Sequence, residues 1–248
     1  MPGALMIGAD AATNPAGTRL GWYGKIPAAG DFVHRGVPRE LIAWWDKWAQ
    51  HGLSALKQMP LDAQREFTAA PLWNFAIPAG PGAGAVQLGT VAPSRDRVGR
   101  LYPLWAVWSV PLAAYESSVL DGAGPYYREA STALLSAVRH GSGAEQLDRA
   151  LNHAAIALRP GPPQPPPSSA GQDILDILNS GPGQTRPLVR SGPEGWPDLP
   201  ACFNPGSHTS YWWTSQVDGA ALQTYLHGGA LNATLFARLF VASGRARF

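Results

Sequence analysis

The segment 21–36 constrains the fold of this chain more than any other stretch. It reads GWYGKIPAAGDFVHRG, and it holds four glycines, one proline, an aromatic pair and several charged or titratable side chains. Glycine permits positive φ and close approach of two backbones, whereas proline fixes φ and lacks an N–H donor. Few other sequences would give the same backbone shape. The segment therefore predicts a shaped loop that forms a recognition surface or the rim of an active site.

A tryptophan-rich helix is predicted directly after this loop. Pro38 suits a helix start, because its missing N–H costs nothing there. Leu41, Trp45, Trp48 and Leu56 then recur at helical spacing. We expect this stripe to pack inward, and each buried indole N–H must find a partner.

The loop and the helix together resemble the amino-terminal signature of the TagF (ImpM) family of type VI secretion accessory proteins. The family typically reads G-[FWY]-[FY]-G-K-[LIV]-P-x-x-G-D-F-x-x-R-G, followed by a helix that carries tryptophan. The chain reads GWYGKIPAAGDFVHRGVP and then WWDKW. The resemblance extends over residues 21 to about 115 and is looser beyond them.

The resemblance implies a non-enzymatic, cytoplasmic accessory protein that represses or regulates type VI secretion after translation. It also implies a protein partner, a forkhead-associated scaffold of the secretion system that is the target of a kinase and phosphatase pathway. Within the motif, the residues expected to bind the partner or to define the loop are Trp22, Lys25, Asp31, Phe32 and Arg35.

Charge and composition exclude other classes of function. The net charge is +2 and only 15% of residues are charged, with no run of lysine or arginine, so we expect no nucleic-acid partner. The nearest basic cluster is Arg95, Arg97 and Arg100, interrupted by Asp96. We interpret 95–97 first as a solvated hairpin turn and second as a partner contact, which adds Arg95 and Arg97 to the candidate site.

Cysteine content and hydropathy bear on location. The single cysteine, Cys202, excludes a disulfide within the chain and a multi-cysteine metal site. Residues 1–17 lack the basic and apolar regions of a secretory signal, so we expect a cytoplasmic protein. The stretch 67–94 carries no charge, but its prolines and glycines argue against a membrane-spanning helix.

Short strands joined by turns predict an α+β (mixed α/β) fold with a largely antiparallel central sheet. The expected strands are 20–26, 72–77, 85–91, 101–111 and 210–215, and the main expected helices are 38–56, 125–139, 144–158 and 231–241. Pro103, near the start of its strand, suggests that this strand is an edge or carries a bulge.

Trp212 and Trp213 are neighbours in a predicted strand, so their side chains must point to opposite faces of the sheet. Both can be buried only if helices cover both faces, or else one tryptophan is exposed for binding. We expect helices on both faces.

The sequence also predicts a division into parts. Residues 159–169 contain six prolines in eleven positions, which is typical of an extended linker. The predicted parts are a flexible extension (1–19), an N-terminal domain (20–158), this linker (159–169) and a smaller C-terminal subdomain (170–248). We expect the last part to complete the sheet of the first or to pack against its edge.

No common catalytic motif is present, and we expect no cofactor and no metal site. The best catalytic pair is Asp31 and His34, three residues apart in the loop, where a carboxylate can orient an imidazole. The simpler interpretation is that Asp31 caps the loop through backbone N–H groups. Lys25 and Arg35 are either an anion site or loop-stabilising side chains. The alternative functions are a small-molecule-binding enzyme that uses Asp31 and His34, and a structural subunit of the secretion apparatus.

Overall fold

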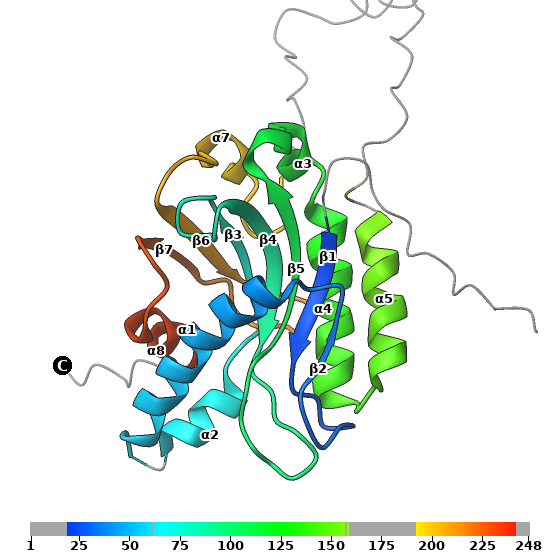
Figure 1. The fold of residues 1–248 in the computed structure, drawn as a ribbon, viewed down its shortest axis with the longest axis vertical. Coiled ribbons are helices and arrows are strands. Elements are labelled where there is room, and N and C mark those ends of the chain that lie inside the picture. The colour runs from blue at the N-terminus through cyan, green and yellow to red at the C-terminus, as the bar shows by residue number, and fades with distance from the viewer. Residues whose placement is uncertain (1–18, 61, 157, 159–191, 242–248) are drawn as a thin grey trace, which may run out of the picture.

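The computed structural model describes residues 19–60, 62–156, 158 and 192–241. Within them, seven strands form one sheet in the order β2-β1-β5-β4-β3-β6-β7, and every neighbouring pair is antiparallel (Figure 1). The strands are β1 (Arg19–Gly24), β2 (Val33–Arg35), β3 (Trp73–Ile77), β4 (Ala85–Ala92), β5 (Leu104–Pro111), β6 (Thr209–Thr214) and β7 (Thr224–Gly228). The predicted antiparallel sheet is confirmed.

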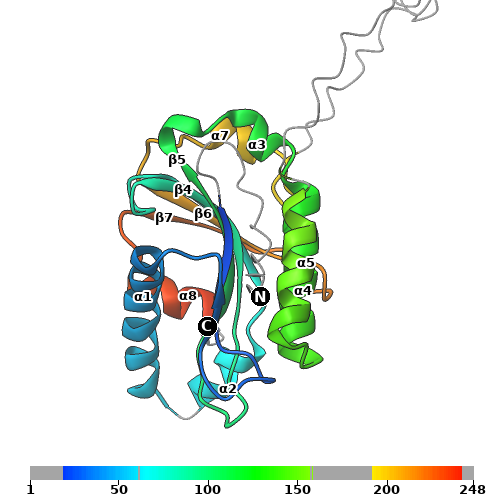
Figure 2. The same ribbon diagram turned by 45° about the vertical axis from the view of Figure 1, so that its right-hand side comes forward.

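Helices cover both faces of this sheet, as Figure 2 shows: α4 and α5 lie on one face, and α1, α2 and α8 lie on the other. The short helices α3 and α7 pack together at one end of the sheet. The described helices are α1 (Arg39–Lys57), α2 (Asp62–Ala69), α3 (Ser117–Asp121), α4 (Gly124–Arg139), α5 (Ala144–Ile156), α7 (Leu199–Cys202) and α8 (Ala233–Phe240), with a 3-10 turn η1 (Leu112–Ala114). The mixed α+β fold is therefore confirmed.

The sheet separates two hydrophobic cores, and the Trp212–Trp213 pair shows why both exist. Trp213 belongs to the core beneath α4 and α5, whereas Trp212 belongs to the core beneath α1 and α8. Both side chains are fully buried. Because adjacent strand residues point to opposite faces, burying both requires the two helical layers that the sequence predicted.

The C-terminal segment joins the same sheet. β6 pairs with β3, and β7 then forms one edge of the sheet. This agrees with the expectation that the C-terminal part completes the sheet of the first. The predicted linker 159–169 and nearly all of the predicted extension 1–19 lie outside the described residues, so the proposed division into domains stays a prediction.

The position of β5 corrects one expectation. β5 pairs with β1 on one side and with β4 on the other, so the suggestion that Pro103 marks an edge strand is wrong. Pro103 precedes the first residue of the strand, Leu104, so its missing N–H takes no donor from the ladder.

The charge-free stretch 67–94 forms the end of α2 and the strands β3 and β4. Within the described residues, no helix has both the length and the apolar character that crossing a membrane requires.

Helix α1 buries the stripe that its sequence predicts. Pro38 is the residue that caps it, and Leu41, Trp45, Trp48 and Leu56 are all buried. The indole Nε1 of Trp48 donates to the backbone oxygen of Asn232 at 2.9 Å, which ties α1 to the start of α8.

A glycine in α1 allows α8 to approach closely, and this gives a testable prediction. A methyl group at Gly52 would overlap the ring of Phe236. Glycine to alanine in a helix interior normally stabilises by about 0.5–1 kcal/mol. Here we expect Gly52→Ala to lower the free energy of unfolding by about 1–3 kcal/mol, as overpacking does. Urea unfolding would measure it, with the exposed Ser54→Ala in the same helix as control. A stabilised Gly52→Ala variant would contradict the close helix contact.

Candidate functional site

Two loops meet at one end of the sheet and form a corner, seen at the bottom of Figure 1. The first (25–32) connects β1 to β2, and the second (93–103) connects β4 to β5. The backbone N–H of Arg97 donates to the carbonyl oxygen of Ala29 at 2.8 Å. The hydroxyl of Ser94 donates to the carbonyl oxygen of Lys25 at 2.7 Å. These long-range bonds hold the motif loop against the second loop.

A buried ion pair lies at the centre of this corner. The Nζ of Lys25 is 2.9 Å from Oδ2 of Asp96, and both side chains are almost inaccessible to solvent. Oδ2 of Asp96 also accepts from Nε of Arg100 at 2.6 Å. Oδ1 accepts from the backbone N–H groups of Val98 and Arg100. One carboxylate therefore organises the whole turn and neutralises the buried lysine, which is what a buried charge requires.

These contacts set the protonation of Asp96. Burial alone would raise its pKa, but the hydrogen bonds from Lys25 and from Arg100 outweigh that effect. The pKa of Asp96 is therefore held well below its usual range, and the carboxylate stays ionised at any physiological pH.

The buried Asp96 corrects the interpretation of 95–97 as a solvated hairpin. Arg95 and Arg97 are exposed, but the residue between them is only 2% exposed. The physical reason is the distant Lys25, whose charge needs a partner inside the corner. The buried Lys25 pairs with Asp96 across the two loops, as a loop-stabilising side chain does. Asp96 was not identified from the sequence as a site residue. The available signal was an aspartate between two arginines, in a chain whose motif places a lysine among apolar residues.

The ion pair predicts a specific acid response. A folded-state pKa below the unfolded value of about 3.9 stabilises the fold above that pH, and the contribution disappears as pH falls toward the folded pKa. Asp96→Asn should therefore be less stable than the wild type at pH 7, and the difference should shrink below about pH 4. Unfolding free energies from pH 7 to pH 3 would measure this. A difference independent of pH would contradict the role given to the Asp96 charge.

An aromatic cluster supports the exposed side of the corner. The ring of Phe32 stacks on Tyr23, with centroids 5.3 Å apart, and meets Tyr102 edge-on at 4.7 Å. The Nζ of Lys25 lies 4.9 Å from the centroid of the Phe32 ring. Tyr102 donates its hydroxyl hydrogen to Asp46 of α1 at 2.7 Å. Burial and the Asp46 charge raise the pKa of Tyr23 to about 12, so this ring is a neutral support.

Two motif glycines are required by close approaches of the backbone. Gly24 has a φ of 144°, and a Cβ there would overlap the carbonyl oxygen of Pro103. Gly36 has a φ of 67° and lies against the backbone of Leu20. Glycine is therefore needed at these two positions because the loop backbone lies in close contact with β1 and β5.

The remaining predicted residues separate into buried and exposed ones. Trp22 is buried, and its Nε1 donates to Oδ1 of Asp148 in α5 at 2.8 Å. Asp31 is exposed, and its Oδ1 accepts from the backbone N–H of the next residue, Phe32, at 2.8 Å. Arg35 is exposed, and its guanidinium donates to the carbonyl oxygen of His34.

The structure does not assemble the alternative catalytic pair. Both Asp31 and His34 are exposed, and no hydrogen bond joins their side chains. Within the described residues, no group of three or more histidine, cysteine, aspartate or glutamate side chains is placed to hold a metal ion.

What the corner presents to solvent is a small mixed patch. We call it the corner surface and define it as Asp31, Phe32, Arg97 and Val98. Phe32 is 37% exposed and Val98 is 68% exposed, although both are large and apolar. Nη2 of Arg97 lies over Gly30, beside Asp31. The patch combines apolar and charged groups on a frame fixed by buried contacts.

Comparison with a family model places the motif in a known domain. Residues 21–154 match the TagF N-terminal domain, described as type VI secretion system-associated. The chain belongs to the TagF family. The matched residues include α1–α4, the strands β2–β5 and most of β1 and α5, and therefore the entire corner surface.

A solved structure extends the likeness beyond the TagF N-terminal domain. The chain is similar to PA0076 from Pseudomonas aeruginosa PAO1, with 26% identity and a TM-score of 0.61. The match covers 91% of this chain and 95% of that one. No curated protein matches the chain.

Proposed function

We propose that the chain is a non-enzymatic, cytoplasmic regulator that represses type VI secretion after translation by binding a protein partner. The partner we propose is a forkhead-associated scaffold of the secretion system. Membership of the TagF family supports the association with type VI secretion. Repression then follows by mass action, because a complex that withdraws an assembly component lowers assembly in proportion to its occupancy.

The observation that carries this proposal is the division of the corner into a buried ion pair and an exposed patch. The buried members, Lys25 and Asp96, neutralise each other inside the corner. The exposed members, Phe32 and Arg97, are an aromatic residue and an arginine, which are both enriched in protein–protein interfaces. Phe32 is also held in one orientation by Tyr23 and Tyr102, so a partner would pay little ordering entropy to contact it.

A deletion strain tests the proposal. We expect loss of this protein to raise the amount of type VI substrates in the culture medium, and complementation with the wild-type chain to restore repression. The forkhead-associated scaffold should co-purify with the tagged chain from the cytoplasm. Unchanged secretion in the deletion strain, together with a purification that lacks the scaffold, would overturn the proposal.

A further inference from the structure

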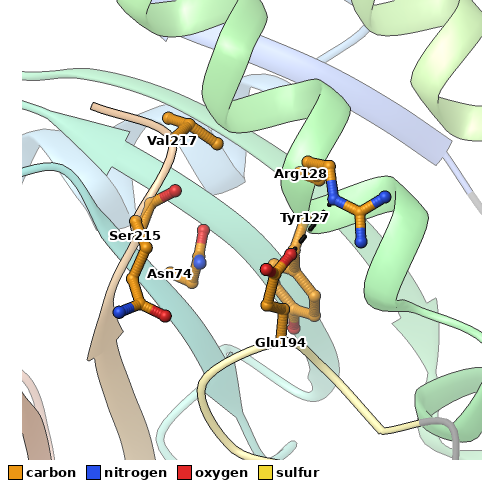
Figure 3. A pocket seen from close by; sticks show the side chains of 7 residues that line it. Asn74, Tyr127, Arg128, Glu194, Ser215 and Val217 are labelled. Carbon is orange, nitrogen blue, oxygen red and sulfur yellow. Dashed lines mark hydrogen bonds and ion pairs between the residues drawn. The ribbon is translucent and has the colours of Figure 1, made fainter. Parts of the chain in front are cut away.

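A cavity of about 130 Å³ lies between β3, the start of α4 and the segments on either side of β6 (Figure 3). It shares no lining residue with the corner surface. The Tyr127 ring and the Val217 side chain give it apolar walls. Tyr127 already donates its hydroxyl hydrogen to the carbonyl oxygen of Phe75 at 2.9 Å, so its ring is fixed in place.

Two buried polar side chains line this cavity without full hydrogen bonding. Asn74 is 3% exposed; its Oδ1 accepts from Ser131 at 2.9 Å, but its Nδ2 has no hydrogen-bond partner among the described residues. Ser215 is also 3% exposed, and only its backbone N–H is paired, to the carbonyl oxygen of Leu72. The Asn74 amide and the Ser215 hydroxyl therefore each leave a donor free for a guest that carries acceptors.

The rim of the cavity carries one charge of each sign. Nε of Arg128 is 3.1 Å from Oε2 of Glu194, and both side chains are 60% exposed. Figure 3 shows this ion pair on the α4 side of the cavity. Because Arg128 and Glu194 neutralise each other, a guest with a single charge would leave one of the two unpaired. A guest that carries both charges can satisfy both sides.

We propose that this cavity binds a small zwitterionic amino acid. Its carboxylate would accept from the amide of Asn74 and the hydroxyl of Ser215, while its ammonium group would face Glu194. The volume is close to the ~150 Å³ of a cavity that holds a benzene-sized guest, which suits a ligand of the size of glycine, alanine or serine. The site is independent of the proposed repression.

Thermal unfolding of the purified full-length chain tests this site. Glycine, alanine and serine are each titrated, with acetate as the carboxylate-only control and ethylamine as the ammonium-only control. We expect at least one amino acid to raise the Tm saturably, by roughly 5–10 °C at about a hundred times its Kd, and neither control to do so.

Matched variants locate the binding. Ser215→Ala and Glu194→Gln should each weaken the effect at least tenfold. Glu145→Gln removes an exposed carboxylate at the start of α5, which does not line the cavity, and should leave the effect unchanged. The proposal is overturned if no amino acid shifts the Tm, if the controls shift it equally, or if the two cavity variants bind as the wild type does.

Discussion

Trp45→Ala should destabilise the chain more than any other single truncation in α1. We expect the free energy of unfolding to fall by about 3–5 kcal/mol, and the Tm by roughly 6–20 °C. The side chain is fully buried. Its ring stacks on Trp105 and packs against Phe75, with centroids 5.0 Å away in each case. Removing it opens a cavity at the centre of the core between α1 and the sheet.

The loss of a buried hydrogen bond destabilises the Trp45→Ala variant further. Nε1 of Trp45 donates to Oε1 of Gln87 at 2.9 Å, and Gln87 is fully buried in β4. The substitution leaves this amide oxygen without a partner, which is itself unfavourable. The neighbouring Trp44 is only half-buried, so Trp44→Ala is the control and should cost about 1 kcal/mol. Urea unfolding of both variants checks the contrast. Equal losses of unfolding free energy in Trp45→Ala and Trp44→Ala would contradict the packing described for α1.

Replacing the exposed residues of the corner surface should abolish repression and leave the fold intact. In a deletion strain, a chain carrying both Phe32→Ala and Arg97→Glu should leave secretion at the level of the deletion. The physical reason is that truncating an interface hot spot costs at least about 2 kcal/mol, which is a loss of affinity of about 30-fold. The measurement is the amount of type VI substrates in the medium at matched protein levels.

A matched control variant tests whether the loss of repression is specific to the corner surface. Leu112 is 45% exposed in η1, beyond the far end of β5 from the corner, and Arg149 is an exposed residue of α5. Leu112→Ala with Arg149→Glu removes a similar apolar group and reverses one charge elsewhere, and it should repress as the wild type does. Phe32 also packs on Tyr23, so Phe32→Ala can affect the stability of the fold as well as the surface. Arg97→Glu alone therefore serves as a second variant, and its melting temperature should be unchanged. Repression retained in both corner variants would place the partner site elsewhere.

The sequence predicted the layered fold from a few strong local patterns. The helical stripe of Trp45 and Trp48 identified the buried face of α1, and the adjacent Trp212 and Trp213 favoured two covered faces over one exposed tryptophan. β7 was missed because residues 224–228 alternate between exposed and half-buried, so the strand carries little hydrophobic signal of its own. Its pairing with β6 is what makes it a strand.

The candidate site was harder to predict because its organisation depends on contacts far apart in the sequence. Asp31 could be interpreted as a loop cap from turn chemistry, and the structure shows one local bond, from the N–H of Phe32 to its Oδ1. The burial of Asp96 depends on Lys25, 71 positions away, and no local pattern contains both. The same limit applies to Trp22, whose partner Asp148 lies in another layer.

In our proposal, the buried residues of the corner hold the exposed Phe32 and Arg97 in place as a partner-binding surface. The most direct test is the dissociation constant between the purified full-length chain and the purified forkhead-associated scaffold. We expect measurable binding by the wild type and by the Leu112→Ala, Arg149→Glu control, and at least about 30-fold weaker binding when Phe32→Ala and Arg97→Glu are combined. Absence of binding by the wild type, or equal binding by all three proteins, would contradict the claim.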